Sequence, residues 1–111
     1  MGRERLPFVN KYVENEINLN AVITDSIGDS IKMSLYKDKS IYVIVSGNTG
    51  AVTLNIEGSN DNTNWVNIRS TTYTAENKND VYSTSAHFQY IRTTTTDHTD
   101  ATVTTAITGR T

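Results

Sequence analysis

The sequence predicts an all-β protein: a single antiparallel β-sandwich of jelly-roll type, with about eight short strands. Threonine and asparagine are unusually common and there is one proline. Threonine favours extended backbone, whereas asparagine favours turns. Apolar and polar residues alternate with a period of two in segment after segment, and no segment has the period of a helix.

Size and composition limit the function as well as the fold. The chain has 111 residues, which suits one domain, and a net charge of −2, which gives no field for holding nucleic acid. It has no cysteine, so disulfides and thiolate metal sites are excluded. The longest strongly apolar run, 41–45, is too short to span a membrane, and no secretory signal peptide is visible at the start. We therefore expect no membrane association and synthesis in a cytoplasm.

Residues 1–14 are predicted to form an extended N-terminal arm, with the sandwich occupying 15–111. The segment starts with charged residues at 3–5 and continues with isolated apolar residues in polar sequence, and such a stretch cannot build a core by itself. One interpretation is an edge strand or a frayed terminus. The other is a docking arm whose contacts with a partner come from Arg3, Arg5, Phe8 and Tyr12.

The predicted strands follow from the alternation, and polar or glycine-bearing turns separate them. In the first half the strands are 17–24, 31–35 and 41–45, the last apolar on both faces and therefore central. In the second half they are 52–57, 65–68, a strand around Tyr73, 81–85, 87–96 and 102–108. The turns between them include 25–29, 46–50, 58–64, 76–80 and 97–100.

From Val52 onward the chain resembles a known kind of module. The segments are VTLNIEGSNDNTNWVNI, HFQYIRTTTT and ATVTTAITGR, which together span 52–110. They resemble small β-sandwich virion proteins of tailed phages, both head decoration and tail-associated proteins, and also discoidin-like carbohydrate-binding sandwiches. The family often has glycine where this chain has Asn62, which still permits the turn. The first 50 residues match no family.

The resemblance implies a non-enzymatic structural protein of the virion, acting as a decoration, stabilising or adaptor subunit. Its expected partners are a major capsid or tail protein, and we expect a homo-oligomer or a symmetric lattice. The alternative is a carbohydrate-binding module for attachment to a host surface. Neither function implies a cofactor.

Catalytic chemistry has few candidate residues. His98 lies in Asp97-His-Thr-Asp100, which is either an acid–base or metal cluster or a plain turn; four adjacent residues seldom converge on one ion. His87 is the only other histidine, and no known catalytic motif occurs. We therefore predict no enzymatic activity. A deep cleft that holds either histidine with a carboxylate would revive the enzyme hypothesis.

Three further segments each have a functional and a structural interpretation. Asn60, Asp61, Asn62 and Asn64 could surround calcium or form an Asx-rich turn, and with one charged ligand we predict no metal. Trp65, Tyr73 and Tyr82 are the candidate aromatic platform for a glycan, although a lone tryptophan in a small sandwich more often belongs to the core. The run 93–96, all threonine, is either a solvated strand or an edge strand that contacts another subunit.

Nucleic-acid binding is not expected. It needs a basic surface interleaved with aromatic residues, and Arg69, Arg92 and Arg110 are scattered along the chain.

Overall fold

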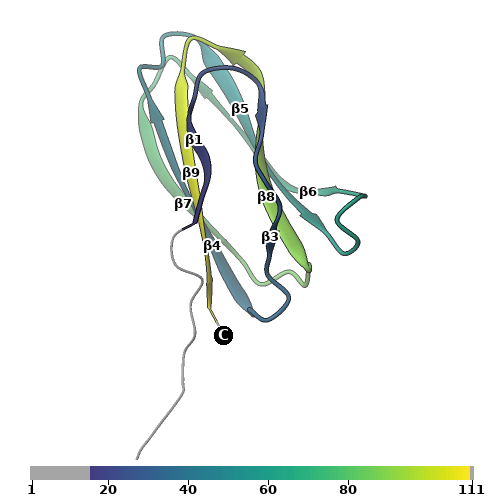
Figure 1. Ribbon diagram of the computed structural model, residues 1–111. Helices are drawn as coiled ribbons and strands as arrows, with labels where there is room; N and C mark the ends of the chain where they lie inside the picture. The colour runs from purple at the N-terminus through teal and green to yellow at the C-terminus, as the bar shows by residue number, and fades with distance from the viewer. Residues whose placement is uncertain (1–15, 111) are drawn as a thin grey trace, which may run out of the picture.

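The computed structural model describes residues 16–110, which form nine strands in two facing antiparallel sheets (Figure 1). The predicted arm, 1–14, and its candidate contact residues Arg3, Arg5, Phe8 and Tyr12 lie outside the described residues. Between 16 and 110 there is no helix that could cross a lipid bilayer. The strands are β1 (Glu16–Val22), β2 (Ser26–Ile27), β3 (Ile31–Lys32), β4 (Asp38–Ser46), β5 (Ala51–Ser59), β6 (Val66–Thr74), β7 (Lys78–Thr84), β8 (Tyr90–Thr99) and β9 (Thr102–Arg110).

The strand order is that of a jelly roll. Sheet A has the order β1-β9-β4-β7, and sheet B has the order β2-β8-β5-β6, with β3 also pairing with β8. Because β2 and β3 both pair with β8, they act as one interrupted strand, and the remaining order is the double Greek key of the jelly roll. The predicted fold class is confirmed.

The strand boundaries differ from the prediction where pairing with a distant strand or a local turn overrides the alternation. The predicted turn 25–29 contains β2, which pairs with β8 through Ser26 and Ile27. The predicted strand 31–35 stops at Lys32, because a turn follows in which the Tyr36 N–H donates to the Met33 carbonyl (3.0 Å). The two predicted strands at 65–68 and Tyr73 are one strand, β6.

The core lies between the sheets and consists of the inward residues of the long strands. In β4 the alternation places Ile41, Val43 and Val45 inside. The same rule buries every second residue of β5 and β9. Full burial of such an aliphatic side chain stabilises the fold by about 1.5–3 kcal/mol. The fully or nearly buried hydrophobic residues are Leu19, Met33, Ile41, Val43, Val45, Val52, Leu54, Ile56, Tyr73, Ile91, Ala101, Val103 and Ile107.

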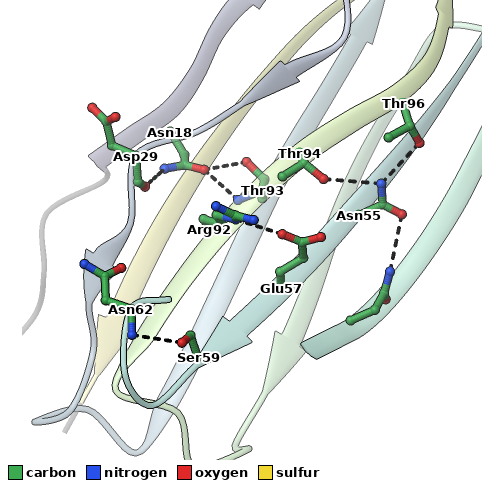
Figure 2. A network of polar contacts seen from close by, with 11 residues as sticks. Asn18, Asp29, Asn55, Glu57, Ser59, Asn62, Arg92, Thr93, Thr94 and Thr96 are labelled. Carbon is green, nitrogen blue, oxygen red and sulfur yellow. Dashed lines mark hydrogen bonds and ion pairs between the residues drawn. The ribbon is translucent and has the colours of Figure 1, made fainter. Parts of the chain in front are cut away.

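A buried polar seam joins the two sheets beside β1. The Thr93 hydroxyl, on β8, lies 2.7 Å from the Thr105 hydroxyl, on β9, and both residues are fully buried. The Thr93 hydroxyl and backbone N–H both donate to Asn18 Oδ1 (2.6 and 2.7 Å). Asn18 Nδ2 in turn donates to the Asp29 carbonyl (2.6 Å), as Figure 2 shows. These bonds fix β1 against sheet B.

The threonine run 93–96 is neither a solvated strand nor an edge. It belongs to β8, which lies inside sheet B between β5 and the pair β2 and β3. Thr93, Thr94 and Thr95 are at most 5 % exposed. Their hydroxyls are satisfied within the fold, which corrects both interpretations of this segment.

Candidate functional site

The segment Asp97–Asp100 is the end of β8 together with the residue that follows it, and its side chains serve the fold. His98 Nε2 lies 2.6 Å from the Ala101 carbonyl and Nδ1 lies 3.3 Å from the Thr95 hydroxyl. Asp97 and Asp100 both adopt positive φ, and the Asp100 carboxylate accepts a hydrogen bond from Thr49. Among residues 16–110 no group of three or more His, Cys, Asp or Glu side chains converges as a metal site would require. The metal-cluster interpretation gains no support from these contacts, and the plain-turn prediction is wrong, because Asp97, His98 and Thr99 belong to β8.

The loop between β5 and β6 is an Asx turn organised by Asp61. The carboxylate accepts hydrogen bonds from the backbone N–H groups of Thr63 (2.9 Å) and Asn64 (2.7 Å), and from the side chains of Asn64 and Ser59. Backbone donation, chiefly from Asn64, holds the pKa of Asp61 well below its usual range. Asn62 has φ +61°, a conformation that asparagine tolerates. The loop's one carboxylate is thus occupied by N–H and O–H donors from the loop itself.

The three aromatic residues of the predicted glycan platform do not share a surface. Tyr73 is 2 % exposed and lies in the core, so it offers no ring face to a sugar, and the prediction is wrong for this residue. Its hydroxyl contacts the Asp80 carboxylate (2.7 Å) and the Tyr82 hydroxyl (2.8 Å). Burial, together with these partners, raises the pKa of Tyr73 far above its usual value. The Tyr82 ring is covered by the Arg69 guanidinium, 4.2 Å from its centroid.

Trp65 lies half-buried directly before β6, against the outer face of sheet B. The Arg92 guanidinium covers its ring at 4.1 Å from the centroid, a cation–π contact. Arg92 Nε also forms an ion pair with Glu57 Oε1 (2.8 Å). The ring is therefore part of a local cluster of an indole, a guanidinium and a carboxylate, which sequence reasoning did not anticipate.

A network of uncharged polar side chains continues from this cluster over the outer face of sheet B (Figure 2). Asn55 donates to the Thr94 and Thr96 hydroxyls (both 3.3 Å) and accepts from the Ser70 hydroxyl (2.7 Å). Next to it, Asp25, Ile27, Arg92 and other residues line a hollow of about 320 Å³. Sheet B therefore presents a polar outer face whose groups largely satisfy one another.

The outer face of sheet A is different, because an apolar row crosses all four strands. Ile17 on β1 pairs with Ala106 on β9, Ala106 pairs with Tyr42 on β4, and Tyr42 pairs with Val81 on β7. Ile17, Tyr42 and Val81 are 57–60 % exposed, and Ile44 lies beside the row on β4. We call Ile17, Tyr42, Val81, Ala106 and Ile44 the apolar row. Exposed contiguous apolar surface of this kind often marks an interaction site.

The surroundings of the apolar row carry few charges, one of which is the exposed Glu16 next to Ile17 on β1. The other outward residues of β4, β7 and β9 are serine, threonine and asparagine, except at one end. There Asp38 and Arg110 are register partners of opposite sign. Removing this face from water would therefore desolvate few charges, and depletion of charge is typical of the centre of protein interfaces.

Sequence reasoning missed the apolar row as a unit. The apolar run 41–45 predicted a central strand covered on both faces; β4 is central in its sheet, but among the described residues nothing covers its outer side chains. The signal in the sequence was that Tyr42 and Ile44 alternate with Ile41, Val43 and Val45, which placed apolar residues on both faces of the strand. The register that aligns them with Val81 and Ala106 depends on non-local pairing, which the sequence pattern does not specify.

Comparison with known proteins finds a likeness among solved structures. No protein-family model matches the chain, and no curated protein sequence is similar to it. Among solved structures, the SPBc2 prophage-derived protein YomS is similar with a TM-score of 0.66 at 10 % identity, over 97 % of this chain and 100 % of that one. At this identity the likeness shows the fold, and the protein that shares it is of phage origin. The predicted likeness to discoidin-like modules stays a prediction.

Proposed function

We propose that the chain is a non-enzymatic structural protein of a phage particle, a jelly roll that docks on a capsid or tail lattice as a decoration, stabilising or adaptor subunit. The observation that carries the proposal is the apolar row on the outer face of sheet A, whose other outward residues on β4, β7 and β9 are uncharged except at one end. The occupant of this face is a neighbouring protein subunit, either a lattice protein or a second copy of the chain.

Three features support this assignment. A flat face with an exposed tyrosine among aliphatic and hydroxyl side chains has the composition of an interface core. Symmetric repetition on a lattice multiplies weak individual contacts, so a face of modest area is sufficient. The fold is shared with a protein encoded by a prophage, which fits a phage setting.

The test places a charge in the apolar row and asks whether docking is lost. Tyr42→Lys adds a positive charge in the middle of the row, and Thr74→Lys adds the same charge at an exposed position of β6 in sheet B. Tagged copies are supplied in cells where the phage assembles, and particles are purified. We expect the wild type and Thr74→Lys to copurify with particles and Tyr42→Lys to be lost. Equal incorporation of folded Tyr42→Lys would contradict the assignment of this face.

A carbohydrate-binding module is the second candidate, and the cluster of Trp65, Arg92 and Glu57 favours it. Indole, guanidinium and carboxylate groups beside the hydroxyls of Thr94 and Thr96 can stack on a sugar ring and hydrogen-bond its hydroxyls. Glycan-array screening of the wild type and Trp65→Ala tests this function. A specific glycan that only the wild type binds, with the variant still folded, would support it; no binding by the wild type would count against it.

A further inference from the structure

Lys39 occupies a position where the strand pattern calls for an apolar residue. It shares the inward face of β4 with Ile41 and Val43, and its side chain is 2 % exposed. Its Nζ donates to the Ala86 carbonyl (2.7 Å), and this is its only hydrogen-bond partner within 16–110. Burial lowers the pKa of Lys39, although the neighbouring Asp38 opposes the shift. Because an ammonium has three N–H donors, Nζ keeps donors for a further acceptor besides the Ala86 carbonyl.

The loops at this end of the sandwich form a hollow of about 470 Å³ beside Lys39. They connect β3 to β4, β5 to β6, and β7 to β8, and hydrogen bonds tie them together. The Met33 N–H donates to the Gln89 carbonyl (2.6 Å), and the Gln89 N–H donates to Asn60 Oδ1 (3.1 Å). The β3–β4 and β7–β8 connections lie at the same end of the molecule as the end of β9 (Figure 1). The hollow is therefore built from tethered loops on a rigid sandwich, the usual setting of binding sites.

The lining of this hollow suits an anion that also carries hydroxyl groups. No aspartate or glutamate lines it. Besides Lys39, its polar lining includes Ser34, Tyr36 and His87, and the Asn60 amide keeps its NH₂ as a donor because its oxygen is already bonded to Gln89. A hollow of this size lies within the range of small-molecule sites.

Aromatic rings complete the lining. Phe88 and Tyr36 both border the hollow. A Cβ added at Gly58 would meet the Phe88 ring at 2.5 Å, so Phe88 is packed directly on the backbone of β5. Rings next to amide and hydroxyl groups are what a pyranose ring with its hydroxyls requires.

We propose that this hollow binds an acidic sugar, a uronate-type monosaccharide unit whose carboxylate pairs with Lys39 Nζ while its ring hydroxyls bond to the loop side chains. The sugar carboxylate gives the Lys39 ammonium a negatively charged acceptor, and the two form a charge-assisted hydrogen bond. Lys39 also borders a second hollow, of about 560 Å³, which Asp38 and Arg110 line with charges of opposite sign. The hollow at the loop end is the one of the two that has no carboxylate in its lining. The site is separate from the apolar row and does not depend on the lattice role.

The experiment measures binding of D-glucuronate to the full chain by calorimetry and by NMR titration. D-glucose has the same ring without the carboxylate, and acetate has the carboxylate without the ring. Lys39→Met removes the ammonium and keeps an apolar chain of similar length. Lys37→Met removes the same charge from an exposed lysine two residues away and is the matched control.

We expect glucuronate to bind the wild type and Lys37→Met alike, and Lys39→Met to bind at least about tenfold more weakly. Glucose and acetate should each bind the wild type at least about tenfold more weakly than glucuronate. Undiminished binding to Lys39→Met, no binding to the wild type, or acetate binding as tightly as glucuronate would overturn the proposal. Should Lys39→Met not fold, the Lys39 side-chain resonances of the wild type decide, since they must shift with glucuronate and not with glucose.

Discussion

Single polar side chains hold the jelly roll together at its seam. Asn18 satisfies both the backbone N–H and the hydroxyl of the fully buried Thr93, and it reaches the Asp29 carbonyl on the β2–β3 connection. It also packs against Gly28, where an added Cβ would lie 2.1 Å from Asn18 Oδ1. One amide therefore links β1, β8 and the β2–β3 connection.

Replacing Asn18 should lower the stability of the fold more than replacing most polar side chains does. Asn18→Ala leaves the backbone N–H of buried Thr93 without its acceptor, leaves the Thr93 hydroxyl with Thr105 as its partner, and removes the bond to the Asp29 carbonyl. We therefore expect a loss of about 2–4 kcal/mol in the free energy of unfolding. Asn20→Ala, two residues away and exposed, should cost less than about 0.5 kcal/mol. Urea denaturation of both variants measures the difference. Equal small losses would show that Asn18 is not the link between the sheets.

Lys39 gives the fold a pH dependence of known sign. Its pKa is lowered in the folded state, so between that lowered value and the unfolded value of 10.5 the unfolded chain binds more protons. Stability from this group therefore rises with pH across that window and is lost as pH falls through it. We expect Lys39→Met to lack this rise, while Lys37→Met keeps it. Unfolding free energies measured at several pH values up to 10.5 test this, and parallel curves for wild type and Lys39→Met would contradict it.

At the scale of elements, β4 shows how one strand serves two purposes. Its inward residues Ile41, Val43 and Val45 build the core, whereas its outward residues Tyr42 and Ile44 belong to the apolar row. The first set is fixed by packing, and the second contributes little to the isolated fold. The outward residues are therefore available for an interface.

This division predicts unequal effects of adjacent substitutions. Ile41→Ala should lower the free energy of unfolding by about 2–4 kcal/mol, because it opens a cavity in the core. Tyr42→Ala should cost no more than about 1 kcal/mol, because it removes only cross-strand contacts on an exposed face. Thermal and urea unfolding of the two variants measure both values. If Tyr42→Ala lowered the free energy of unfolding as much as Ile41→Ala, the outer face would be as important for stability as the core.

The alternation predicted the long strands and the jelly-roll class, because β4, β5 and β9 are amphipathic ladders whose period is local. It did not find β2, a two-residue strand that exists through its pairing with β8. Nor did the alternation predict the burial of Thr93 to Thr95. Threonine occurs on both the buried and the exposed face of a sheet, and these three residues are buried because β8 lies inside sheet B. The candidate sites were missed because they also depend on non-local structure. The register between strands assembles the apolar row, and three separate loops assemble the hollow beside Lys39.

At the scale of the whole molecule, the jelly roll offers surfaces of different character. The outer face of sheet A is apolar at its centre and has its charges at the margins, and the outer face of sheet B is a polar network. The loop end holds the Lys39 hollow. A subunit that uses sheet A for its lattice contact leaves sheet B and the loop end available to other ligands.

Removing residues 1–14 should separate folding from docking. Every residue of the described core lies at Leu19 or later, so we expect the truncated chain to fold and to unfold within a few degrees of the full chain. If Arg3, Arg5, Phe8 and Tyr12 contact the partner, the truncated chain should no longer assemble on particles. Circular dichroism and particle copurification measure the two properties. An unfolded product, or full retention of assembly, would contradict the role of the arm.

The central claim, that the chain is a structural part of a phage particle, is tested most directly by the protein composition of purified particles. Quantitative mass spectrometry of density-banded particles from the source phage measures the copies of this chain relative to the major capsid and tail proteins. We predict a fixed ratio to one of those proteins, unchanged by further purification. A chain that is abundant in the lysate and absent from the banded particles would contradict the claim.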